Sequence, residues 1–172
     1  MEGMSAPPRP AVATADPDRE AQRTMRSFLT AARLLSEQLG HELRREGGMS
    51  QIHYELLDWL SEAPGLRLRM NELARRTGVS ASRLSHLADR LEQRGWIERA
   101  EDPGDRRALL ARLTPAGRVA LEEAAPWHAD CARTRLLDHL SADQLRRLRE
   151  ISDQLSGRLT LPEPRGTPPP GP

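Results

Sequence analysis

Lysine is absent from this sequence of 172 residues, and all 26 of its basic side chains are arginine. The absence excludes Schiff-base chemistry and a Walker-type phosphate loop, because both need a lysine amine. Arginine keeps its proton at any useful pH, so these groups can act only as fixed charges and hydrogen-bonding forks. Genomic coding bias would explain the choice of arginine, but it leaves the placement of the arginines to be explained.

Cysteine, aromatic residues and long apolar runs are also scarce. The single cysteine, Cys131, excludes a disulfide framework and suggests a reducing compartment. Its thiol is either a redox sensor or a small buried apolar group. No stretch approaches about 18 apolar residues, and the N-terminus has no apolar signal region, so we expect a cytoplasmic protein that does not enter a membrane.

The few aromatic residues argue against binding of RNA or single-stranded DNA. Such proteins use aromatic side chains interleaved with basic ones as stacking platforms. No such cluster occurs among the aromatic residues, which are Phe28, Tyr54, Trp59, Trp96 and Trp127.

The histidines do not form a recognisable catalytic or metal site. None of the five, His41, His53, His86, His128 and His139, has the spacing of a zinc motif or of a Cys–His nucleophile. The run from Gly78 to Ser82 lacks the last glycine of a nucleophile elbow. We therefore expect no enzyme activity, no metal and no cofactor.

Proline is concentrated at the two ends of the chain. Four of the 14 prolines lie in residues 1–17 and six in 162–172. A segment this rich in proline cannot form a helix interior or a strand ladder, so we expect disordered tails over 1–17 and 162–172.

The first helix is expected to begin at Asp16-Pro17 and to end at Gly47-Gly48. Its apolar residues are spaced alternately four and three apart, as in a heptad seam over about three heptads. They are Ala21, Met25, Phe28, Ala32, Leu35 and Leu39. Such a seam must be buried against later helices or against a second copy of the chain.

The remaining pattern predicts a mainly α-helical fold with a small β-hairpin. We expect a helix over 51–61 capped by Ser50, a strand stub over 66–69, and helices over 71–76 and 81–94. Strands over 96–99 and 109–113 should flank a turn at 102–105. A long helix should follow Thr114 and be kinked or broken at Pro126. Ser141 and Gln144 form a capping box for a last helix whose inner face carries Leu145, Leu148, Ile151 or Ser152, Leu155 and Leu159.

The residues from Leu73 to Leu87 have the spacing of a helix-turn-helix. Ala74 is small enough for two short helices to cross, and Gly78 can adopt the turn conformation that other residues resist. Val79, Leu84 and Leu87 should fill the core between the helices.

The second helix of this motif separates an apolar from a polar face. Its outward residues are short and polar, which would allow the helix to lie against base edges. A solvated surface is the alternative for the same face. The candidate contacts are Ser80, Ala81, Ser82, Arg83, Ser85, His86 and Arg90, with Asp89 on the same side.

The hairpin places Arg106 and Arg107 next to its turn, within reach of a narrow minor groove. Asp105 could hold one of these two guanidinium groups in a bidentate pair.

The charge is unevenly distributed. Residues 67–118 hold 12 arginines and seven acids, or +5, whereas the rest holds 14 arginines and 18 acids, or −4. A basic excess over the helix-turn-helix and hairpin is what phosphate binding requires.

Residues 49–119 resemble the MarR family of winged-helix transcription regulators. The resemblance lies in Arg69-Met70-Asn71-Glu72-Leu73-Ala74, Gly78-Val79-Ser80, the run from Asp89 to Arg99, and Asp105-Arg106-Arg107 leading to Leu113-Thr114-Pro115-Ala116-Gly117. It implies a homodimeric repressor on a pseudo-palindromic DNA operator. The implied layout is an N-terminal dimerisation helix over 18–48, a winged helix-turn-helix over 49–114 and C-terminal dimerisation helices over 115–161.

The resemblance also implies release from DNA by a small-molecule effector. Members that sense peroxides resemble one another in a cysteine on the first helix, and here no cysteine precedes Cys131. Members that sense small anions use a cleft between the dimer helices and the winged lobe. Its candidate lining residues are His53, Trp59, Trp127 and His128, although side chains of these types are more often packed or partly exposed than in contact with a ligand. A winged helix that serves only protein contacts is the alternative function.

Overall fold

The computed structural model describes residues 17–159, with the exception of the Arg106 side chain. The predicted cap Asp16 and the predicted tails, apart from Pro17, lie outside the described residues. Within residues 17–159, no helix combines the length and the apolar character needed to cross a membrane.

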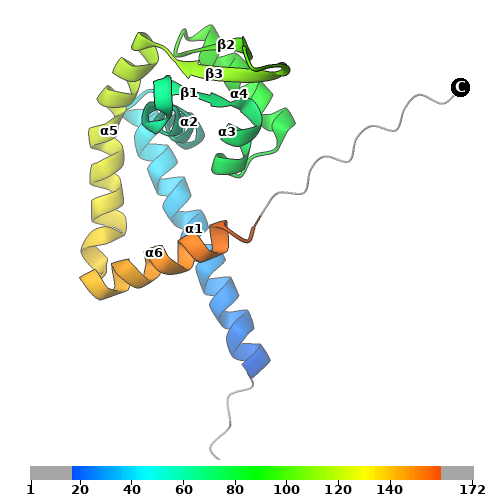
Figure 1. Ribbon diagram of the computed structural model, residues 1–172. Coiled ribbons are helices and arrows are strands. Elements are labelled where there is room, and N and C mark those ends of the chain that lie inside the picture. The colour runs from blue at the N-terminus through cyan, green and yellow to red at the C-terminus, as the bar shows by residue number, and fades with distance from the viewer. Residues whose placement is uncertain (1–16, 160–172) are drawn as a thin grey trace, which may run out of the picture. The chain divides into compact units, whose positions relative to one another are not determined.

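The chain is mainly helical and carries one small antiparallel sheet, which confirms the expected fold class (Figure 1). The helices are α1 (Pro17–Arg45), α2 (Gln51–Glu62), α3 (Met70–Thr77), α4 (Ala81–Gln93), α5 (Pro115–Arg135) and α6 (Ala142–Ser156). The strands are β1 (Arg67–Arg69), β2 (Ile97–Asp102) and β3 (Asp105–Leu113), and single 3-10 turns occupy Pro64–Leu66 and Leu137–His139.

The core lies where α2, α3 and α4 pack against the sheet. Its largest fully buried side chains are all leucines, namely Leu43, Leu56, Leu57, Leu60, Leu73, Leu84 and Leu91. The strand order is β1-β3-β2, and β3 contributes Ala111 and Leu113 to the core. Leucines at helical spacing therefore hold the helix-turn-helix on the base of the hairpin.

The turns of the helix-turn-helix use the residues expected from the sequence. Gly78 ends α3 with a φ of +65°, and Gly95 follows α4 with a φ of +68°. Ser80 begins α4, where its hydroxyl accepts a hydrogen bond from the Arg83 N–H at 3.3 Å. The small Ala74 is buried as predicted.

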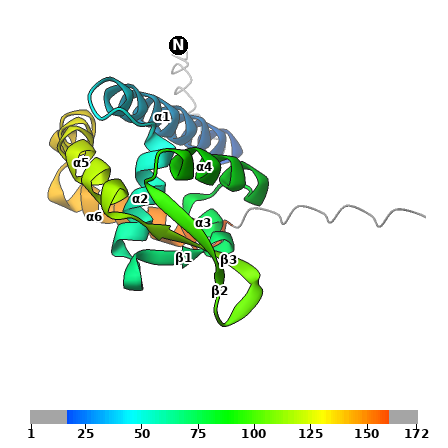
Figure 2. The same ribbon diagram turned by 90° about the horizontal axis from the view of Figure 1, so that it is seen from above.

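The β2–β3 hairpin is longer than the short strands predicted from the sequence, and it extends beyond the helices (Figure 2). Its pairing runs from Ile97 opposite Leu113 to Asp102 opposite Asp105. The sequence pattern did not predict the ends of the strands near the turn, because the residues there are mostly charged and the apolar alternation has already stopped.

The break predicted at Pro126, one of the two alternatives there, is wrong, because α5 is a single helix of 21 residues that continues past this proline. Proline removes only one N–H, whose acceptor would be the carbonyl of Glu122 four residues earlier. Glu122 is exposed, so water can hydrate that carbonyl. The capping box of Ser141 and Gln144 at the start of α6 is confirmed.

The chain divides into two units, Met1–Leu34 and Leu35–Pro172. In the described part of the first unit, every residue is exposed, including Met25 at 59%, Phe28 at 46% and Leu29 at 57%. In the second unit, α6 has no buried residue, and Ile151 is 53% exposed. Much of the apolar face predicted for each of these helices is therefore exposed in the single chain.

Gly117, in the first turn of α5, lies against the backbone that follows α4. A Cβ atom at this position would overlap the Trp96 carbonyl oxygen and lie 2.9 Å from Leu113 Cδ1. Thr114 joins the same two segments, because its hydroxyl donates to the Gly95 carbonyl at 2.6 Å and accepts from the Gly117 N–H at 3.0 Å. The Leu-Thr-x-x-Gly element is therefore a packing junction between the hairpin and α5.

We expect Gly117→Ala to lower the free energy of unfolding by about 2 kcal/mol, because the added methyl group must displace backbone. Urea unfolding at one fixed protein concentration, followed by tryptophan fluorescence, measures the change. Gly104→Ala is the control, since a Cβ there would meet only Asp102 Oδ1 at 3.5 Å. Equal stability of the two variants would contradict the close packing at Gly117.

Candidate nucleic-acid interface

Helix α4 buries one face and exposes the other. Leu84, Leu87, Ala88 and Leu91 are buried, whereas Ser82, Arg83, Ser85, His86 and Arg90 are exposed. Ser85 donates its hydroxyl hydrogen bond to the Ala81 carbonyl at 3.1 Å. The short side chains of Ser82 and Ser85 allow this face to approach another molecule closely, and the longer Arg83, His86 and Arg90 lie on the same exposed side.

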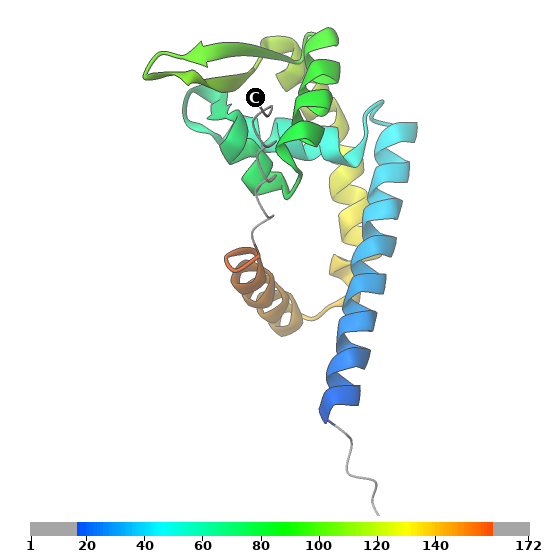
Figure 3. The same ribbon diagram turned by 90° about the vertical axis from the view of Figure 1, so that its right-hand side faces the viewer.

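The β2–β3 hairpin, called the wing below, projects from the same lobe as α4 (Figure 3). Arg107 is the third residue of β3 and is therefore close to the turn. Asp105 accepts a hydrogen bond from the Arg107 backbone N–H at 3.1 Å, and in the described structure it forms no ion pair with the Arg107 guanidinium. Among the described residues, no carboxylate pairs with Arg107. Its guanidinium is therefore available for a phosphate or a groove.

Three ion pairs, formed by two arginines, connect the hairpin to the start of α3 and to α4. Arg69, at the end of β1, places Nε 2.6 Å from Asp102 Oδ2 in the wing. Arg99, in β2, contacts Asp89 and Glu92 of α4 at 2.7 and 2.6 Å. Asp102 also accepts the Gly104 N–H at 2.9 Å, and these two bonds lower its pKa.

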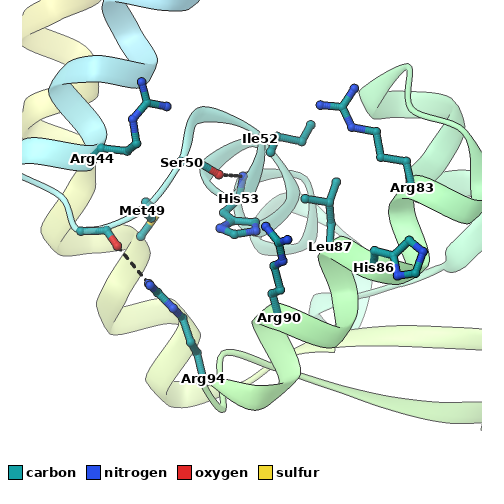
Figure 4. A pocket seen from close by; sticks show the side chains of 11 residues that line it. Arg44, Met49, Ser50, Ile52, His53, Arg83, His86, Leu87, Arg90 and Arg94 are labelled. Atoms are coloured by element: carbon teal, nitrogen blue, oxygen red, sulfur yellow. Dashed lines mark hydrogen bonds between the residues drawn. The ribbon is translucent and has the colours of Figure 1, made fainter.

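A cavity of about 500 Å³ lies between α4, the end of α1 and the start of α2. Its charged lining is entirely basic and consists of Arg44, Arg83, Arg90 and Arg94, with His53 and His86 beside them. Figure 4 shows Arg44 on one side, Arg83 on the other and His53 between them. Met49, Ile52 and Leu87 give the cavity an apolar part.

The arginines of this cavity have little compensating charge. Arg94 donates to the Gly48 carbonyl at 2.9 Å, and its guanidinium lies 4.6 Å from the centre of the Trp96 ring. In residues 17–159, no carboxylate forms an ion pair with Arg44, Arg83, Arg90 or Arg94. Four unpaired like charges around one cavity make it a favourable place for an anion.

His53 is buried in this basic surrounding. It is 9% exposed, and its Nε2 has no hydrogen-bond partner in the described structure. Burial lowers the pKa of His53, and the charges of Arg94 and Arg90 lower it further. The imidazole is therefore held neutral at neutral pH.

The structure does not bring the four predicted effector-contacting residues into one cavity. Only His53 lines the basic cavity. His128 stacks on Tyr54 with ring centroids 4.2 Å apart, and Trp59 lies 5.1 Å beneath the Arg76 guanidinium. Trp127 is 46% exposed on α5. These ring contacts favour a packing role for Trp59 and His128 over direct contact with a ligand.

Cys131 is 5% exposed, and burial raises the pKa of its thiol. A raised pKa lowers the fraction of reactive thiolate. The environment therefore favours the second of the two roles considered for Cys131, a small buried apolar group.

Sequence reasoning missed Arg44 of the cavity and both ion-paired arginines, Arg69 and Arg99. No local pattern marks Arg44, because it lies about 40 residues before α4 along the chain. The excess of positive charge over residues 67–118 was the sequence signal for a basic surface, and Arg44 lies outside that range.

Comparison with known proteins supports the interpretation of this lobe. The model of the MarR family matches residues 47–108. The transcriptional repressor MprA of Escherichia coli is 31% identical over 126 residues, which cover 73% of this chain and 71% of MprA.

Two solved structures from Streptomyces coelicolor are also similar. Sco3205, a MarR family regulator crystallised in complex with DNA, is 40% identical with a TM-score of 0.77, over 83% of this chain and 92% of that one. AbsC, another MarR family regulator, is 36% identical with a TM-score of 0.72, over 79% and 94% of the two chains.

The chain belongs to the MarR family of winged-helix transcriptional regulators. The resemblance seen in the sequence is thereby confirmed. Because the family consists of regulators, its membership also supports the expectation that the protein is not an enzyme.

We expect the free energy of unfolding to fall as the pH falls below 6.5, the ordinary pKa of histidine. The unfolded chain takes up protons there, whereas the lowered pKa values of His53 and His128 delay uptake in the folded protein. Urea unfolding across this pH range measures the slope. His53→Gln should reduce it, and an equal reduction in the exposed control His139→Gln would contradict this origin.

Proposed function

We propose that this protein is a cytoplasmic transcriptional repressor that binds, as a homodimer, a pseudo-palindromic operator in double-stranded DNA. The observation that carries the proposal is the exposed polar face of α4 next to an arginine-bearing hairpin, within a region of net charge +5. The excess of positive charge supplies affinity for phosphates, and the short polar side chains supply access to bases.

The helix from Ser80 to Arg94 is the proposed base-reading element. In a dimer, two such helices would enter successive major grooves about 34 Å apart. Ser82, Ser85 and His86 lie on the exposed face and can reach base edges, while Ala81 allows close approach. Arg83 and Arg90 are exposed at the flanks, where backbone phosphates lie.

The wing supplies the second proposed contact. Arg106 and Arg107 belong to the hairpin strand that leaves the turn, and the Arg107 side chain is exposed. An arginine at this position can enter the minor groove that flanks the major-groove site.

The exposed apolar residues of α1 and α6 support self-association. Met25, Phe28 and Ile151 each remain about half-exposed in the single chain. Apolar side chains in a repeating seam gain stability when they are removed from water, and a second copy offers a matching seam.

We further propose that the effector is a small organic anion bound in the basic cavity. The unpaired arginines would hold its charge, and Met49, Ile52 and Leu87 would contact an apolar body. Arg83 and Arg90 line the cavity and are also proposed phosphate contacts. Because arginine cannot lose its proton, pairing with an anion is the available way to remove its charge from DNA binding.

The first experiment determines the native mass and measures a gel shift, at two salt concentrations, on duplexes selected by the protein from a random library. A dimer with a salt-dependent shift on preferred duplexes supports the proposal. A dimer that selects no duplex would indicate the alternative function, a winged helix used for protein contacts.

We expect Arg107→Ala to weaken binding to all duplexes and to reduce the slope of log K against log salt by about one unit, because one phosphate-neutralising charge is lost. Fluorescence anisotropy over a salt series measures both quantities. His86→Ala is the comparison, since it should change which duplexes are preferred and leave the slope unchanged. An unchanged slope in Arg107→Ala would rule out the wing contact.

We expect benzoate to release the protein from its duplex, whereas the neutral isostere benzamide should not, because the cavity selects charge. Acetate tests whether the apolar ring is needed. Arg44→Gln should weaken the response to benzoate, measured by anisotropy and calorimetry. Its neighbour Arg45, which pairs with Glu42 and Glu46 outside the cavity, provides the control Arg45→Gln. Equal responses to benzoate and benzamide would contradict the anion site.

A further inference from the structure

Arg99 of β2 binds α4 through ion pairs and hydrogen bonds. Its Nη2 lies 2.7 Å from Asp89 Oδ1 and 2.6 Å from Glu92 Oε2, and its Nε lies 3.1 Å from the same Glu92 oxygen. The Arg99 backbone N–H also donates to Glu92 Oε1 at 3.1 Å. One residue thus binds two carboxylates of α4 through side chain and backbone together.

The geometry of these contacts restricts the hairpin relative to α4. A planar guanidinium that is held by two acceptors has a defined orientation, and the backbone bond fixes the strand itself. Arg99 is three residues before Asp102, where β2 ends at the turn of the wing. A shift of β2 along α4 would break these bonds and displace the turn.

Asp89 and Glu92 carry negative charge on a helix that is proposed to bind DNA. Their side chains are 46% and 40% exposed, on a helix whose other exposed residues are proposed to contact DNA. Without compensation, each carboxylate would repel nearby phosphates. The hydrogen bonds from Arg99 lower the pKa of Glu92, so the pairing is favourable with the acid ionised.

We propose that Arg99 is a positioning residue for DNA recognition, which joins the reading helix to the wing and neutralises the two carboxylates beside the DNA. The inference rests on the proposed function of α4 and the wing. Arg99 itself contacts no base. Specificity depends on Arg99 because α4 and the wing must fit adjacent grooves of one duplex simultaneously.

Arg112 of β3 provides a matched control in the same hairpin. It pairs with Glu98 alone at 3.1 Å, and the two side chains are 62% and 57% exposed. That pair joins one strand to its neighbour and does not reach α4. Arg99→Gln and Arg112→Gln therefore remove the same charge from the same sheet but differ in the connection that is lost.

The experiment measures the dissociation constants of the full-length protein for a duplex that the wild type selects and for a random duplex of equal length. We expect Arg99→Gln to lower the ratio of specific to random binding about tenfold, whereas Arg112→Gln should change it less than about threefold. Arg99→Lys should retain random binding but still lower the ratio, because an ammonium group cannot orient both carboxylates through a planar fork.

A triple variant separates positioning from charge. Adding Asp89→Asn and Glu92→Gln to Arg99→Gln removes the repulsion, so random binding should recover while the specific ratio stays low. Full recovery of the ratio would overturn the positioning role, and equal ratios for Arg99→Gln and Arg112→Gln would overturn the proposal as a whole.

Thermal melting checks that each variant is folded. If Arg99→Gln does not fold, the same ratio of specific to random binding is measured for Arg99→Lys and for the double variant Asp89→Asn, Glu92→Gln. A ratio equal to that of the wild type in both would overturn the proposal. A wild type that selects no duplex would instead refute the proposed function itself.

Discussion

The burial of one face of α4 is the constraint on which the rest of the lobe depends. Leu84, Leu87 and Leu91 are fixed in the core, and each buried leucine contributes about 2 kcal/mol relative to exposure. A rotation of the helix would bring these side chains into water. The opposite face, with Ser82 and His86, must therefore point outward, and its short side chains define what the helix can approach.

Permanent charge is the second organising element, because every basic group of this chain is an arginine. Where arginines meet acids, as at Arg69–Asp102 and Arg99–Asp89, they connect the wing to the helix-turn-helix. Where they have no acid nearby, as around the basic cavity, they leave an uncompensated field. The same residue type thus serves as a structural link in one place and as an anion-attracting surface in another. Only the position of the carboxylates distinguishes the two roles.

The helices outside the winged lobe are nearly balanced in charge. In α1, α5 and α6 together, 12 arginines accompany ten acids, and Met25, Phe28 and Ile151 of α1 and α6 are largely exposed in one copy. This small net charge keeps repulsion between two associated copies low, while residues 67–118 stay basic. Net charge alone, at +1, conceals the uneven distribution.

The sequence by itself determined the element order, the caps and the helix-turn-helix, because these depend on spacings within a few residues. Ser50, Ser80, Gly78 and Gly95 act at these positions through their own backbone and side-chain geometry. The family motif was recognisable for the same reason. Contacts between distant segments could not be predicted, since many partners at similar distances are compatible with one pattern.

Only the tertiary structure decided that Asp105 accepts a backbone N–H and leaves Arg107 unpaired, and that Arg99 reaches two acids of α4. It likewise brought Arg44 to the cavity beside α4 and separated His53 from Trp59 and His128. The physical reason is the same in each case. Ion pairs and cavities depend on where packed elements meet to within an ångström or so, and that placement is set by the whole core.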